Sequence, residues 1–163
     1  MMTGVIIIIA LASDHVGYTL KVEIIELLEE MELKYKDFGT YDNQQCDYPV
    51  YSYKAATAVA SGECDKGILF CGTGVGISIA ANKVKGIRCV VCTEPYSAVL
   101  SKAHNDSNML AMGARVIGVE MAKMIAKQWL LTDFEGGRHL KRVLLIQDIE
   151  EGKMKQNVFN INT

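Results

Sequence analysis

The sequence has 163 residues, of which 50% are hydrophobic and 22% are charged. That composition is typical of a globular protein with a sizeable core and excludes an intrinsically disordered chain. The formal net charge of −2 provides no basic excess for neutralising a phosphate backbone, so no nucleic-acid partner is expected. We predict one domain over residues 1–152, followed by a polar C-terminal tail over residues 153–163.

The longest apolar run, residues 5–12, is too short to cross a bilayer and lacks the charged start and cleavage site of a signal peptide. No membrane partner is therefore expected. The five cysteines are odd in number and lie mostly within apolar segments, which is typical of free thiols in a reducing compartment. The expected location is cytoplasmic.

Segments with strand character alternate along the chain with segments of helical periodicity. The predicted strands are residues 5–12, 33–38, 67–71, 88–92, and 109–112 with 116–117. The predicted helices are residues 20–31, 49–61, 76–84, 95–104, 119–129 and 140–151. This alternation predicts a doubly wound α/β fold with three layers, in which helices cover both faces of the sheet (α/β/α). The sheet would have five mostly parallel strands and be of Rossmann-like type.

Ligands of such sheets bind beyond the carboxyl ends of the strands, where Cys71-Gly72-Thr73-Gly74-Val75-Gly76 follows the third predicted strand. The glycines let backbone amides turn inward as an anion nest, and the next helix adds the positive end of its dipole. A cysteine beside such a turn would have its thiolate stabilised and could act as a base. From spacing alone, the alternative interpretation is a strand-terminal cysteine before a tight packing turn.

The glycine loop departs from two nucleotide-binding patterns. A P-loop would continue from Gly76 with Lys and then Ser or Thr, and the dinucleotide fingerprint would need a glycine where Ile77 stands. Glu94 does follow the fourth predicted strand, where an acid could hold a ribose. A nucleotide-binding module without catalysis therefore stays open at this point.

His15, His104 and His139 lie outside the periodic apolar stretches, as both catalytic and ordinary surface histidines do. No pair of cysteines or histidines has the close spacing of zinc ligands on a loop, so no metal site is expected. Cys89 and Cys92 have the spacing of a redox pair, but positions three apart in a strand face opposite sides. A redox protein is the less favoured alternative.

Arg138 and Arg142 are four residues apart at the start of the last predicted helix, so they share one helix face. Two guanidinium groups in that position can bind a phosphate with bidentate hydrogen bonds. A solvated helix face is the other interpretation of the same spacing.

Together these segments resemble the type B ribose-5-phosphate isomerase family, whose relatives include allose- and galactose-6-phosphate isomerases. The matching segments run in the family's order over about residues 5–150, and they are residues 13–17, 47–49, 71–83, 86–88, 92–98, 104–106 and 135–139. The cysteine loop with its helical continuation is highly specific. The departures, an extension before Val5 and the polar tail, touch no motif.

The resemblance implies that Cys71 is the proton acceptor and that His104 is the acid that opens the furanose ring. The substrate-binding residues that it implies are Asp14, His15, Tyr48, Gly72, Thr73, Gly74, Val75, Gly76, Asn105, Arg115, Arg138 and Arg142. Among these, the loop amides would hold an enediolate oxyanion and the arginine pair would bind the phosphate. The resemblance also implies a homodimer or homotetramer with sites at the subunit interface, where the partner supplies the loop near His104.

The activity implied is that of an aldose–ketose isomerase, an intramolecular oxidoreductase. It would interconvert D-ribose 5-phosphate and D-ribulose 5-phosphate through an enediolate, in the non-oxidative pentose phosphate pathway. Moving a proton between adjacent carbons needs no redox cofactor, so neither a cofactor nor a metal is expected. The alternative is the same chemistry on a six-carbon substrate, allose or galactose 6-phosphate.

Overall fold

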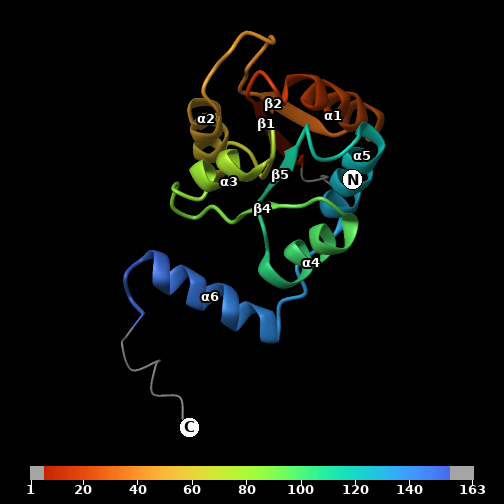
Figure 1. The fold of residues 1–163 in the computed structure, drawn as a ribbon. Coiled ribbons are helices and arrows are strands. Elements are labelled where there is room, and N and C mark those ends of the chain that lie inside the picture. The colour runs from red at the N-terminus through yellow and green to blue at the C-terminus, as the bar shows by residue number, and fades with distance from the viewer. Residues whose placement is uncertain (1–5, 155–163) are drawn as a thin grey trace.

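The computed structural model describes residues 6–154, which form a parallel sheet flanked by helices (Figure 1). The strands are β1 (Ile8–Ser13), β2 (Lys34–Asp37), β3 (Lys66–Cys71), β4 (Cys89–Val91) and β5 (Met109–Gly113). The helices are α1 (Tyr18–Glu30), α2 (Tyr48–Ala60), α3 (Val75–Ala81), α4 (Pro95–Asn105), α5 (Val119–Leu131) and α6 (Arg138–Glu150). Val5 of the first predicted strand and most of the predicted tail lie outside the described residues.

The sheet has the strand order β2-β1-β3-β5-β4, and every pairing is parallel. The chain goes outward from β1 to β2 and then returns to β3, so a topological switch point lies between the carboxyl ends of β1 and β3. Ser13 pairs with Phe70 across these two strands. The segments that begin at Asp14 and Cys71 therefore leave the sheet side by side.

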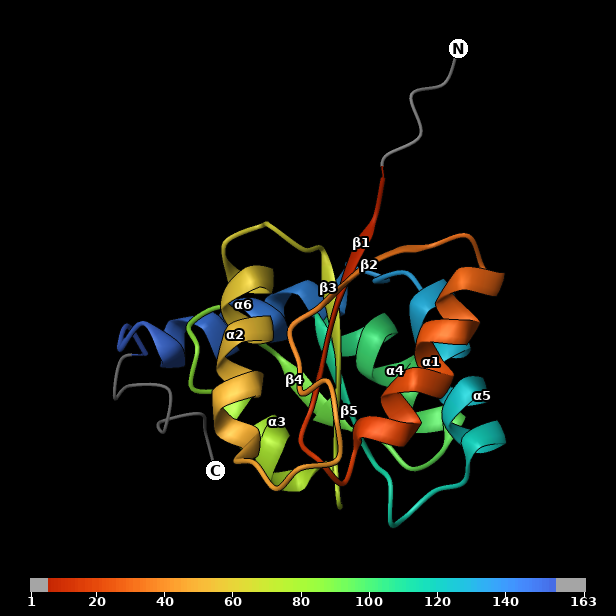
Figure 2. The ribbon, with the colours of Figure 1, turned by 90° about the horizontal axis from the view of Figure 1, so that it is seen from above.

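Helices cover both faces of the sheet, which confirms the predicted three-layer fold. Ile9 and Leu11 of β1 pack into a core with α1 and α5, whereas Ala10 and Ala12 pack into a second core with α2 and α3. Figure 2 shows these two pairs of helices on opposite faces of the sheet. A strand buried on both faces has no polar side to alternate with, which explains the continuous apolar run in the sequence. Among the described helices, none is long and apolar enough to span a membrane.

Two of the element boundaries that differ from the prediction have a clear local cause. Helix α3 ends three residues early because the side chain of Asn82 pairs with both backbone groups of Cys89, each at 2.8 Å. Strand β5 does not include Val116 and Ile117, whose N–H groups donate to the carbonyl of Gly113 at 2.9 and 3.1 Å in a turn. In both places a local hydrogen bond overrides an apolar sequence pattern.

A buried ion pair joins α1 to the end of β2. The Lys21 ammonium is fully buried, and it donates to both carboxylate oxygens of Asp37 at 2.7 Å and to the Thr40 carbonyl at 2.6 Å. Burial lowers the pKa of Lys21, and Asp37 opposes that shift. The pair therefore anchors the segment after β2 that leads toward the carboxyl edge of the sheet.

Replacing Asp37 by asparagine is predicted to lower the free energy of unfolding by about 3 kcal/mol, because the Lys21 charge stays buried without its counterion. Urea denaturation measures this loss. The matched control is Glu63→Gln, which breaks an exposed ion pair with Lys36 and is expected to cost less than about 1 kcal/mol. Equal losses in the two variants would contradict the role assigned to the buried pair.

Candidate active site

The Cys71 loop is built around an amide that faces the sulfur. Cys71 ends β3 and is 4% exposed, and the N–H of Gly74 donates to its Sγ at 3.1 Å. Gly74 has φ of +79°, and a Cβ there would lie 3.1 Å from the backbone carbon of Met112. Only glycine suits that conformation and that space. An N–H donor is thus held against the sulfur that is predicted to be the proton acceptor.

The end of β5 fixes this loop from the other side. The N–H groups of Ala114 and Arg115 donate to the carbonyls of Cys71 and Gly72 at 2.9 and 3.0 Å. The Arg115 side chain lies over Gly72, with Nη1 3.8 Å from the place that a Cβ on Gly72 would take. An exposed guanidinium therefore stands beside the nest, where it can attract an anionic substrate.

Asp14 and His15 lie next to the same loop. The N–H of Asp14 donates to the carbonyl of Phe70 at 3.1 Å, and its Oδ1 accepts the N–H of Gly17 at 2.8 Å at the start of α1. The Nδ1 of His15 accepts the N–H of Cys46 at 3.3 Å. That contact places the proton of a neutral His15 ring on Nε2, which leaves a donor for a substrate hydroxyl.

Tyr48 covers the far end of the glycine loop. Its ring atoms lie 2.6 to 3.0 Å from the position that a Cβ on Gly76 would occupy, so any side chain at Gly76 would displace the ring. The structure thus gathers one set of predicted site residues at the carboxyl edge of the sheet. This carboxyl-edge group consists of Asp14, His15, Tyr48, Cys71, Gly72, Thr73, Gly74, Val75, Gly76 and Arg115.

His104 lies at the opposite edge of the sheet. Helix α4 starts after the carboxyl end of β4 and runs back to its C-terminus, where His104 is the penultimate residue. The next segment joins the start of β3, where the N–H of Gly67 donates to the carbonyl of Asn108 at 3.0 Å. Because six residues of β3 span about 17 Å, one chain does not bring His104 to Cys71.

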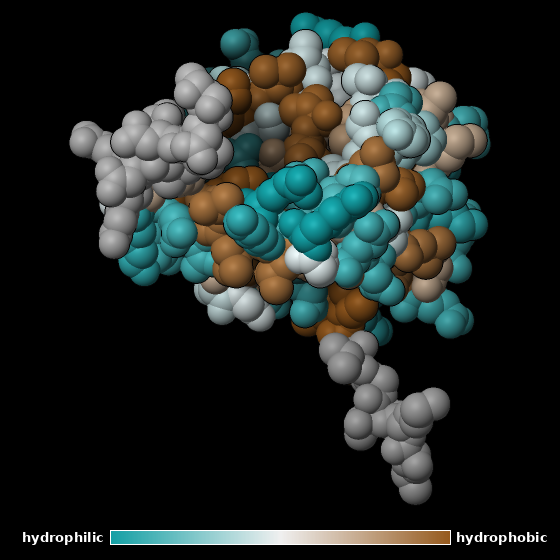
Figure 3. Space-filling view, turned by 90° about the horizontal axis from the view of Figure 1, so that it is seen from below, coloured by the Kyte–Doolittle hydropathy of each residue, from teal (hydrophilic) through white to brown (hydrophobic). Residues whose placement is uncertain are grey.

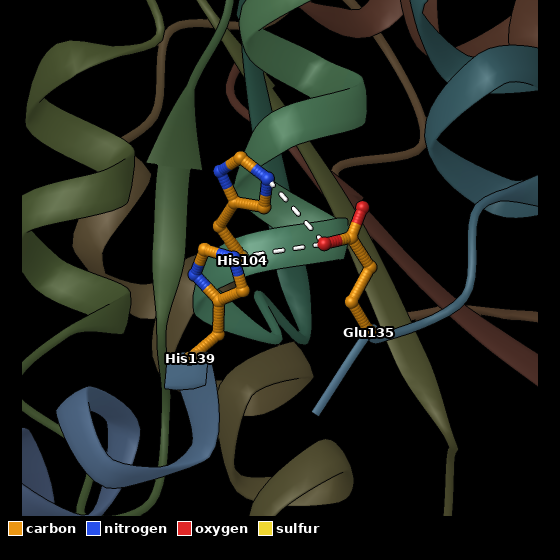
Figure 4. Close-up of side chains that lie close together, drawn as sticks. All are labelled: His104, Glu135 and His139. Carbon is orange, nitrogen blue, oxygen red and sulfur yellow. Dashed lines mark ion pairs between the residues drawn. The ribbon is translucent and has the colours of Figure 1, made fainter. Parts of the chain in front are cut away.

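A second group surrounds His104 at this amino edge (Figure 4). His104 and His139 stack with their ring centroids 4.0 Å apart, and Glu135 Oε2 lies 3.7 and 3.6 Å from their respective Nε2 atoms. Arg138 donates from Nε to His139 Nε2 at 3.2 Å, and Arg142 follows one turn later on α6. The amino-edge group consists of His104, Asn105, Glu135, Arg138, His139 and Arg142.

Two features of the amino-edge group differ from the sequence interpretation. His139 is only 7% exposed, so the expected access is absent, and burial is the main cause that lowers its pKa. No functional role was predicted for Glu135, although it lies in the segment 135–139 that matches the family. The close approach of residues 104, 135 and 139 depends on the packing of α6 against α4, which spacing along the chain does not reveal.

The residues on which the two alternative functions depended, a nucleotide-binding module and a redox protein, have structural roles. The Glu94 carboxylate accepts the N–H of Ser97 at 2.9 and 3.1 Å, so it caps α4, and this contact lowers the pKa of Glu94. Cys89 and Cys92 belong to cores on opposite faces of the sheet, as predicted. Burial raises the pKa of both thiols, that of Cys92 to about 11, which is unfavourable for thiol exchange.

Comparison with known proteins agrees with this geometry. The profile of the Ribose/Galactose Isomerase family matches residues 9–146. Ribose-5-phosphate isomerase B of Escherichia coli is 57% identical over 143 residues, covering 88% of this chain and 96% of that protein. A putative sugar phosphate isomerase of Bacillus subtilis is 51% identical over 144 residues, covering 88% and 97% of the two chains.

Solved structures extend the likeness to three dimensions. Ribose-5-phosphate isomerase B of Clostridium thermocellum superposes with a TM-score of 0.89 at 51% identity, and the match covers 91% of this chain and 100% of that one. A family profile that spans most of the chain, close relatives and the shared fold all lead to one assignment. The chain belongs to the ribose/galactose isomerase family of sugar-phosphate isomerases.

Proposed function

We propose that the protein interconverts D-ribose 5-phosphate and D-ribulose 5-phosphate. The observation that carries the mechanism is the 3.1 Å hydrogen bond from the Gly74 amide to the Cys71 sulfur inside a glycine loop. The substrate is supported by the 57% identical relative, which is itself a ribose-5-phosphate isomerase. The described cysteines are all free thiols, which supports a cytoplasmic location. The proposed substrate belongs to the non-oxidative pentose phosphate pathway.

Cys71 serves as the base in this proposal. Its thiolate takes the proton from carbon 2 of the open-chain aldose, and the electron pair moves onto the oxygen of carbon 1 to give an enediolate. A proton then passes from the hydroxyl of carbon 2 to the oxygen of carbon 1. The Cys71 thiol returns its proton to carbon 1, and the carbonyl forms at carbon 2 to give the ketose. Amides of the loop from Gly72 to Gly76 hold the negative oxygen, and each such donor contributes about 3–4 kcal/mol of transition-state stabilisation.

The complete site requires two copies of the chain. Cys71 and His104 lie at opposite edges of one sheet, so His104 of a second copy has to complete the site at Cys71. Helix α6 supports such an assembly, because several of its large apolar side chains are exposed. These side chains are Leu140, Leu144, Ile146 and Ile149, which are 44 to 60% exposed. Figure 3 shows apolar patches between hydrophilic side chains on the face that carries α6. A homodimer, or a homotetramer built from dimers, satisfies this requirement.

The second copy also supplies the phosphate site. Arg138 and Arg142 are exposed, lie one turn apart and stand next to His104, so they bring two cations to the substrate together with the ring-opening acid. The phosphate is remote from the reacting carbons. Its binding energy positions the sugar between the carboxyl edge of one subunit and the amino edge of the other. Asn105 follows His104 directly and takes a place in the same pocket.

A coupled assay with ribose 5-phosphate in the presence of EDTA tests the proposed function. We expect turnover to be unchanged by the chelator, because the proton transfer uses only protein groups. Turnover of allose 6-phosphate and galactose 6-phosphate is expected to be at least about tenfold slower, since a longer chain misplaces the phosphate relative to Cys71. Faster turnover of a six-carbon substrate would overturn the assignment in favour of that sugar.

A further inference from the structure

The amino-edge group contains one carboxylate that faces two imidazoles. The rings of His104 and His139 are nearly parallel, with 3° between their planes, and the Glu135 carboxylate approaches Nε2 of each (Figure 4). Two imidazolium ions stacked at 4.0 Å would repel each other. The carboxylate therefore stabilises a proton on one ring at the expense of the other.

His139 is the ring that stays neutral. Its Nε2 accepts the N–H of Arg138, so the lone pair of that nitrogen is already in use and its proton is on Nδ1. Burial lowers the pKa of His139, and the charges of His104, Arg138 and Arg142 lower it further, while Glu135 alone opposes them. The negative charge of Glu135 is therefore available to interact with His104.

Glu135 is fixed beside His104 by the backbone. Its N–H donates to the carbonyl of Ala103 at 3.0 Å, which ties the segment before α6 to the last turn of α4. The side chain of His104 is 31% exposed, and its other ring nitrogen points away from Glu135 (Figure 4). One nitrogen of His104 thus faces a carboxylate while the other stays available to a ligand.

We propose that Glu135 is a positioning residue for ring opening, which holds Nε2–H of His104 so that Nδ1–H donates to the furanose ring oxygen. The inference rests on the proposed function. The Nδ1 proton moves to the ring oxygen, the bond from that oxygen to carbon 1 breaks, and the anomeric hydroxyl releases its proton to water as the carbonyl forms. The ring that remains is neutral, with Nε2–H still directed at Glu135. The arrangement follows the logic by which an acid orients a catalytic histidine.

A metal ion is the other species that two histidines and a glutamate could hold, since their ligand atoms lie within 4.8 Å of one another. The geometry opposes it. Each imidazole lone pair lies in its own ring plane, and parallel planes do not converge on one ion. The lone pair of His139 Nε2 is also already occupied by the N–H of Arg138, a cation that would repel a metal ion.

The test compares two reactions of the same enzyme. Ribose 5-phosphate has to open its ring, whereas ribulose 5-phosphate cannot form a furanose because its oxygen 5 carries the phosphate. We expect Glu135→Gln to lower turnover of ribose 5-phosphate by about 10- to 100-fold, less than the full contribution of a general acid. Deuterium uptake from D₂O at carbon 1 of ribulose 5-phosphate, which needs only enolisation, is expected to stay within about twofold of the wild type.

Asp133→Asn is the matched control, because it removes a carboxylate from the same segment without altering the histidine stack; both reactions should be unchanged. His104→Asn should show the same split as Glu135→Gln, and Glu135→Asp should recover part of the lost turnover. Equal losses in both reactions of Glu135→Gln would overturn the inference and indicate a structural role. A wild-type protein inactive on ribose 5-phosphate would instead overturn the proposed function.

Discussion

Replacing Cys71 by alanine should lower turnover of ribose 5-phosphate by about three to four powers of ten, the upper range for a general base. The sulfur accepts the Gly74 amide at 3.1 Å, and alanine offers nothing that can take the proton from carbon 2. Sugar-phosphate binding should stay nearly intact, because the arginines and loop amides are unchanged. Steady-state kinetics and calorimetry with ribose 5-phosphate measure the two quantities separately.

Cys64→Ala is the matched control for this variant. Cys64 is a buried thiol, 1% exposed, in the same core as Cys71, but it lies before β3, whereas Cys71 is the last residue of that strand. Both substitutions delete one buried sulfur and should cost a similar, small amount of stability. Only Cys71→Ala should lose turnover and deuterium exchange at carbon 1. Exchange that persists in Cys71→Ala would show that another group is the base.

The carboxyl-edge group could be predicted from the sequence because it depends on local features. A strand buried on both faces is a continuous apolar run, and the residues just after such a run lie at the carboxyl edge of a parallel sheet. Asp14 and the glycine loop after Cys71 could therefore be placed together from the sequence. The strand order could not be predicted, because nothing within a strand states which neighbours it pairs with.

The amino-edge group depends on packing between distant elements, and periodicity does not describe that packing. His104 comes from the end of α4, Glu135 from the segment before α6, and His139 from the first turn of α6. The stack therefore forms only when these helices meet. The burial of His139 has the same origin. Their spacing predicts that Arg138 and Arg142 share one helix face. It does not predict that this face lies away from Cys71 of the same chain.

Separation of the two groups predicts that two inactive variants restore each other. A dimer that combines one Cys71→Ala chain with one His104→Asn chain has one site in which both residues are intact. Random reassociation makes half of the dimers mixed, so activity should recover to about a quarter of the wild-type value. The measurement is turnover of ribose 5-phosphate after the two purified variants are unfolded and refolded together.

The matched control mixes Cys71→Ala with Arg115→Ala, whose changes both lie in the carboxyl-edge group. Each site of that mixed dimer carries one defect, because Arg115 lies over the Gly72 of its own chain, and no recovery is expected. If His104 instead shared a site with Cys71 of its own chain, the turnover of the first mixture would not exceed the sum of the turnovers of the two separate variants. Recovery in the first mixture alone therefore assigns the acid and the base of one site to different subunits.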